Sequence, residues 1–146
     1  MNADRATTYR LELAKKHLNL AEEDLELKRW VSAASNAQLG LENAAKAIVA
    51  CFGLVPRSHD VAEHLEGISM NELPPELAGE VQTIIPIVAK YGLKKHILVT
   101  YGDEKAYLTP WELFGEEEAT GEVEDARRCV ALAEGVYKHF FKNPCR

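Results

Sequence analysis

The chain has 146 residues, of which 47% are hydrophobic, and this length and composition suit one domain with a buried core. Its formal net charge of -6 argues against non-specific binding to DNA, which depends on clustered Lys and Arg facing phosphates. No apolar run reaches the roughly 18 residues that a membrane span needs, and residues 1–13 lack the apolar segment of a secretion signal, so we expect a cytoplasmic protein with no membrane contact.

Residues 5–28 are predicted to form a long helix that is apolar on two faces. The first face repeats at spacings of three and four residues and consists of Leu11, Ala14, Leu18, Ala21 and Leu25. The second lies on nearly the opposite side and consists of Tyr9, Leu13, Leu20 and Leu27. One face should meet the core, and the other should be covered by another helix of the chain or by a second subunit. In the second case, the chain forms a homodimer with Leu13, Leu20 and Leu27 at its interface.

Residues 30–52 are predicted to form a second helix, which is rich in Ala and Ser. Small side chains allow another helix to approach closely, so packing at the centre of a bundle is favoured over a ligand groove. Glu42 and Lys46 lie one turn apart with the acid on the N-terminal side, which is the favourable order for an ion pair. This pair can serve structure alone or contact a ligand.

A short third helix is predicted over residues 59–68. Ser58 or Asp60 can cap its N-terminus. His59 and Glu63 lie one turn apart, so they can share a face and supply half of a metal site. Catalytic zinc normally takes three protein ligands and no third ligand is indicated, so we expect neither a metal nor another cofactor.

The next part of the chain is predicted to be helical over residues 76–99, with a kink or a break at Pro86. Ser69 and Glu72 have the spacing of a capping box just before this helix. The β-branched run at 96–101 could pass for a strand. A single strand without a partner is improbable, so we interpret the run as a helix end.

The last part of the chain is predicted to contain a short helix and a long one. Thr109 and Glu112 form a capping-box pattern around a proline, which is typical of a helix start. Gly115 and Gly121 should interrupt the helical pattern after this start, and the final helix is predicted over 118–142. Together, these elements predict an all-α fold in a single domain over residues 1–146. The fold is an up-and-down helical bundle of four to five main helices with short extra helices.

The stretch from residue 33 to residue 65 resembles the HEPN domain family (higher eukaryotes and prokaryotes nucleotide-binding). In that family, a helix with a Glu and, four residues on, a Lys leads through a short Gly-containing loop to a Ser/Thr-His-Asp helix start. The matching positions here are Glu42, Lys46, Ser58, His59 and Asp60. The likeness extends in outline from the first helix to the last.

The resemblance implies a helical bundle that commonly dimerises, with a cleft at or near the dimer interface for a nucleotide or RNA. Similar prokaryotic members are often encoded beside a minimal nucleotidyltransferase and act with it as a toxin–antitoxin pair. The function expected on this basis is that of a nucleotide-binding or partner-binding subunit. The nucleotide-binding residues expected are Glu42, Lys46, His59, Asp60, Tyr101 and Asp103.

An alternative function is that of a metal-independent endoribonuclease. Many HEPN proteins cleave RNA with an Arg, four to six intervening residues and a His. Thr100 stands where the family would place this Arg, and no His follows at the right distance. The resemblance therefore implies a chain without RNase activity of its own, although Arg57 and His64 have the spacing of such a pair elsewhere. A dimerisation module without a ligand is the remaining alternative.

Overall fold

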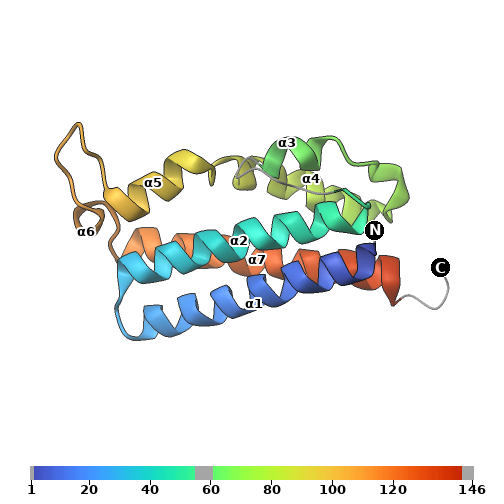
Figure 1. Cartoon of the computed structure of the whole chain (residues 1–146), viewed down its shortest axis with the longest axis horizontal. Helices are drawn as coiled ribbons and strands as arrows, with labels where there is room; N and C mark the ends of the chain where they lie inside the picture. The colour runs from blue at the N-terminus through green and yellow to red at the C-terminus, as the bar shows by residue number, and fades with distance from the viewer. Residues whose placement is uncertain (1, 55–60, 143–146) are drawn as a thin grey trace.

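The structure is a computed structural model that describes residues 2–54 and 61–142. Three long helices lie side by side along the molecule (Figure 1), and they are α1 (Ala3–Glu26), α2 (Trp30–Cys51) and α7 (Glu116–Phe141). The shorter helices form a further layer over α2 and α7: α3 (Val61–Glu66), the 3₁₀ helix η1 (Met70–Glu72), α4 (Pro75–Ala89), α5 (Leu93–Tyr101) and α6 (Pro110–Leu113). The predicted all-α, up-and-down bundle is confirmed.

The layer of shorter helices divides between the two ends of the bundle. α3 and α4 lie over the C-terminal end of α2, where α1 begins and α7 ends (Figure 1). α5 and α6 lie over the N-terminal end of α2, beside the corner that joins α1 to α2. The two ends of α2 therefore face different neighbours.

α1 and α2 pack closely because the residues between them are small. The predicted helices at 5–28 and 30–52 agree with the observed bounds to within two residues. The alanines of α2 that face the core are fully buried, and they include Ala33, Ala37, Ala44 and Ala47. At Gly40, an added Cβ would lie 3.3 Å from the carbonyl oxygen of Ala14 and 3.4 Å from the nitrogen of Leu18. The two backbones are thus nearly in contact, which confirms the prediction of close bundle packing.

The predicted helix at 76–99 is two helices, and the break does not fall at Pro86. α4 continues through Pro86 to Ala89, and α5 begins after Gly92. Tyr91 lies in the break with its side chain buried, and its hydroxyl donates a hydrogen bond to the Asp125 carboxylate at 2.6 Å. This hydrogen bond holds the chain against α7 at the break. Pro86 is exposed, and it removes only one backbone hydrogen bond near the end of α4.

The capping predictions differ in their outcomes. Thr109 and Glu112 form the predicted capping box at the start of α6. The capping box predicted for Ser69 is wrong, because its side chain makes no capping hydrogen bond and only a 3₁₀ turn follows. The run at 96–101 is a helix end as predicted, in α5.

The last helix begins two residues earlier than predicted, directly after Gly115. The Glu118 carboxylate accepts a hydrogen bond from the Gly115 N–H at 2.8 Å, which fixes this start. Gly121 lies inside α7 and does not interrupt it. The helix is held by its inner face, whose buried members include Val123, Ala126, Val130, Ala133 and Val136.

Neither of the two stretches that the structure describes contains a helix that is both long enough and apolar enough to cross a membrane.

The close approach of α1 and α2 predicts opposite effects for two glycine substitutions. Gly40→Leu should lower the free energy of unfolding by about 1–3 kcal/mol, since the side chain meets backbone atoms that cannot move aside. Gly121→Ala is the matched control, because no atom lies within 4 Å of its added Cβ. It should raise the free energy of unfolding by roughly 0.5–1 kcal/mol through helix propensity. Urea unfolding measures both, and equal stability of the two variants would contradict this packing.

Candidate functional site

The structure brings Glu42 and Lys46 together on α2. Lys46 Nζ lies 3.1 Å from Glu42 Oε2, and the side chains of Lys46 and Glu42 are only 11% and 15% exposed. Next to them, Arg10 donates a hydrogen bond to the Asn43 side chain at 3.1 Å, which ties α1 to α2. The pair therefore lies beside a polar contact between α1 and α2. A partly buried pair of this kind serves structural specificity as readily as ligand binding.

Four of the residues considered in the sequence lie outside the described residues, namely Arg57, Ser58, His59 and Asp60. His64, the proposed partner of Arg57, lies in α3 and is half-buried. The nuclease role of Arg57 and His64 stays a prediction. Within residues 2–54 and 61–142, no group of three or more potential His, Cys, Asp or Glu ligands could hold a metal ion.

Tyr101 and Asp103 lie beyond the N-terminal end of α2, whereas the Glu42–Lys46 pair lies near its middle. Thr100, beside them at the end of α5, shares a hollow with Trp30, the first residue of α2. Glu42 is twelve residues further along α2, a distance of about 18 Å at the rise of an α-helix. The described nucleotide-binding candidates therefore form two separate groups within one chain, and their binding roles stay predictions.

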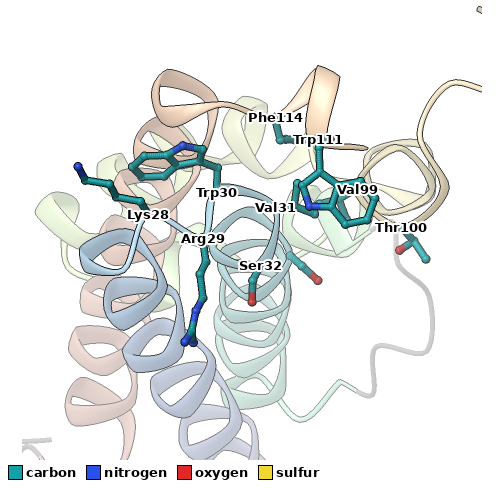
Figure 2. A pocket seen from close by; sticks show the side chains of 10 residues that line it. Lys28, Arg29, Trp30, Val31, Ser32, Val99, Thr100, Trp111 and Phe114 are labelled. Carbon is teal, nitrogen blue, oxygen red and sulfur yellow. The ribbon is translucent and has the colours of Figure 1, made fainter. Parts of the chain in front are cut away.

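The hollow that includes Thr100 has a volume of about 590 Å³, within the range of small-molecule sites (Figure 2). It lies between the α1–α2 corner, α5 and α6. Its apolar lining consists of Trp30, Val31, Val99, Trp111 and Phe114, and its polar lining consists of Lys28, Arg29, Ser32, Ser35 and Thr100. Apart from Thr100, these residues were not identified as a site from the sequence. Two features of the sequence could have indicated it: a tryptophan at the start of each of two helices, and two adjacent cations at the corner between the first two helices.

Lys28 and Arg29 give the hollow a positive rim. They occupy the three-residue corner between α1 and α2, where Lys28 has a left-handed backbone with φ of 59°. The Arg29 N–H donates to the Asp24 carbonyl at 2.8 Å, and its side chain is 61% exposed with Nη1 3.8 Å from Asp24 Oδ1. No carboxylate belongs to the described lining of this hollow. A chain with net charge -6 thus carries a local cationic rim here.

Trp30 and Trp111 give the hollow two indole rings from different elements. Figure 2 shows them on opposite sides of Val31 and Ser32. Trp111 is 75% exposed and is held by the capping box of α6, whereas Trp30 is half-buried against the core. Indole faces stack with planar rings, and Lys and Arg bind phosphate oxygens, so this arrangement can bind an aromatic anion.

A buried acid of α7 fixes the wall that α5 gives to the hollow. The Gln38 amide donates to Glu122 Oε1 at 2.7 Å, and Lys95 Nζ of α5 lies 3.4 Å from Glu122 Oε2. The Lys95 ammonium also lies 6.0 Å from the ring centre of Phe114, which lines the hollow. Burial raises the pKa of Glu122, while Gln38 and Lys95 oppose that rise.

Comparisons with known proteins agree with this architecture. The family model described as the HEPN domain matches residues 7–143. The crystal structure of TT1696 from Thermus thermophilus is similar with a TM-score of 0.68 and 23% identity, over 93% of this chain and 99% of that one. The crystal structure of ST0689, an archaeal HEPN homologue, is similar with a TM-score of 0.63 and 17% identity, over 94% of this chain and 100% of that one. No curated protein matches the chain significantly.

The raised pKa of Glu122 predicts a pH-dependent stability difference. In the unfolded chain this glutamate loses its proton near pH 4.3, before it does so in the folded chain, so its contribution to stability is lost as pH rises through the folded pKa. Glu122→Gln removes this loss and keeps a side chain that can bond to Gln38. The free energy of unfolding of the variant, relative to the wild type, should therefore increase with pH above about 4.3.

The control for this experiment is Glu117→Gln, an exposed acid in the first turn of the same helix. Urea unfolding from pH 4 to pH 8 compares both variants with the wild type, and the rise attributed to burial should be specific to Glu122→Gln. A constant difference between Glu122→Gln and the wild type would show that burial does not shift this carboxyl.

Proposed function

The chain belongs to the HEPN domain family, and we propose that it is a nucleotide-binding subunit that works with a partner protein. The observation that carries this proposal is the hollow between Trp30 and Trp111, with Lys28 and Arg29 at its rim. Its volume, its indole rings and its positive charge match a base joined to phosphates.

The lining of this hollow favours one orientation of a nucleotide. The base stacks on Trp111, which is exposed, and its ribose side faces the hydroxyls of Ser32 and Thr100. The phosphates face Lys28 and Arg29, whose ammonium and guanidinium groups donate charge-assisted hydrogen bonds. Ser32 already donates its hydroxyl proton to Asp24 at 2.7 Å, so its oxygen serves as an acceptor for the ligand.

Binding without cleavage is favoured by the residue at position 100. RNA cleavage of the family type needs an Arg to stabilise phosphate charge and a His to transfer protons. Thr100 offers neither, and no histidine belongs to the described lining of the hollow. The nucleotide therefore serves as a ligand in this proposal.

Two assemblies complete the proposal. The resemblance to prokaryotic HEPN proteins supports a minimal nucleotidyltransferase as partner, in a toxin–antitoxin type of system. The α1 surface supports a homodimer, because Tyr9, Leu20 and Leu27 are about half exposed or more, and Leu13 is half-buried in the same row. Burial of this row against a second copy would remove apolar area from water.

The nucleotide site is tested by calorimetric titration with ATP and AMP. Trp111→Ala should weaken both about ten-fold or more, because stacking on an aromatic ring is worth ~1–3 kcal/mol per base. Arg29→Ala should weaken ATP more than AMP, since only ATP carries the outer phosphates. Arg127→Ala is the control for Arg29, as it removes a comparably exposed arginine from α7.

Two results of this titration would redirect the proposal. Loss of binding in Lys46→Ala, with Trp111→Ala unaffected, would move the site to the Glu42–Lys46 pair. Cleavage of RNA in EDTA by the wild type, lost in Arg57→Ala and His64→Ala, would make the chain a nuclease.

The α1 interface is tested by light scattering during gel filtration. Leu20→Glu should convert a dimer into a monomer, because it places a charge within the apolar row. Leu93→Glu is the control, since Leu93 has nearly the same exposure but lies on α5. A dimer that survives Leu20→Glu and Leu13→Glu contradicts this interface. The partner is tested on the same column, where co-expression with a minimal nucleotidyltransferase should give a complex of larger mass.

A further inference from the structure

A second hollow adjoins the first and has the opposite charge. Both hollows share Thr100 and Trp111 in their linings. The second is lined by three aromatic rings, from Tyr101, Tyr107 and Trp111, and by two acids, Asp103 and Glu104, with no Lys or Arg among its described lining. We propose that it binds an arginine side chain of a partner protein.

The three rings are exposed in a way that a monomer does not explain. Tyr101, Tyr107 and Trp111 are 66%, 91% and 75% exposed, and all three come from an eleven-residue stretch. Aromatic side chains are enriched at protein interfaces and form many of their strongest contacts. Such a cluster on one surface therefore indicates a site of association.

Hydrogen bonds fix the backbone of the turn from which one of the rings projects and which adjoins the other two. Asp103 and Leu108 exchange two backbone hydrogen bonds, of 2.8 and 3.0 Å, across a tight turn. Within this turn, Tyr107 has a left-handed backbone with φ of 60°, a conformation that a bulky residue seldom adopts. Gly102 joins the turn to α5 so closely that an added Cβ would lie 2.2 Å from the Leu108 carbonyl oxygen. The hollow is thus built from fixed elements, which lowers the entropy cost of binding.

The negative charges of the second hollow favour a cationic ligand. A phosphate would be repelled by Asp103 and Glu104, whereas a guanidinium is attracted by them. Asp103 Oδ1 accepts a hydrogen bond from the Ala106 N–H at 3.1 Å, which orients its carboxylate in the turn. An arginine is planar, stacks on aromatic rings and donates two parallel hydrogen bonds to a carboxylate, so it suits both parts of the lining.

This proposal goes beyond nucleotide binding and does not depend on it. Of these two hollows, only the second is lined by Asp103 and Glu104, and only the first is lined by Lys28 and Arg29. Trp111 is the one ring in the described linings of both, so a partner arginine on its outer side would lie next to a nucleotide on its inner side. A partner bound in this way would cover the mouth of the nucleotide site.

The test uses a short fluorescent peptide with three arginines and a counterpart in which neutral citrulline replaces each arginine. Fluorescence anisotropy should show at least ten-fold tighter binding of the arginine peptide to the full chain. The double variant Tyr101→Ala/Tyr107→Ala should lose this binding, and Glu104→Gln should weaken it several-fold. Glu117→Gln, which removes an exposed acid from α7, should leave it unchanged.

Several outcomes would overturn the proposal. Equal binding of the two peptides would show that the arginine charge is not recognised. An equal loss of affinity in Glu117→Gln and Glu104→Gln would indicate general attraction to an acidic chain. Loss of a homodimer in the tyrosine double variant would assign the hollow to a second copy, and binding to phosphatidylcholine vesicles without peptide binding would assign it to a choline group. Arg29→Ala must leave peptide affinity unchanged, which separates this result from failure of the nucleotide site.

Discussion

The near contact of the α1 and α2 backbones is the constraint on which the remaining structure depends. At Gly40 the space between the two helices leaves little room for a Cβ, and alanines fill the rest of the seam. Polar ties such as Arg10 to Asn43 and Ser32 to Asp24 add specificity to this close packing. The second of these ties fixes the corner that carries Lys28 and Arg29.

The layer formed by α5 and α6 is attached to this seam by few contacts. Its own apolar cluster is small and contains Ala34, Val99 and Phe114 as buried members. Lys95 of α5 and the buried Glu122 of α7 add an ion pair to this attachment, beside the ring of Phe114. Because Val99 and Phe114 also line the hollow between the tryptophans, the position of α5 sets the shape of that hollow.

Much of the fold follows from local sequence rules. The bounds of α1, α2 and α7 follow the apolar spacing, and the capping box at Thr109 forms as its pattern predicts. Local rules failed where a distant residue intervened. Pro86 was expected to end or kink a helix, yet the chain breaks at Tyr91, whose hydroxyl bonds to Asp125 on α7. A bond between residues 34 positions apart leaves no periodic signal in either segment.

The sequence by itself determined the family, the fold class and the Glu42–Lys46 pair, because apolar spacing and an i, i+4 pair act within a single helix. Tertiary structure alone decided which distant residues meet. Trp30 and Trp111 are 81 positions apart and share a hollow, while Lys28 and Glu104 lie on adjoining hollows of opposite charge. These sites arise from the packing of α5 and α6 on the α1–α2 corner, and that packing depends on long-range contacts such as Lys95 with Glu122, which no local pattern encodes.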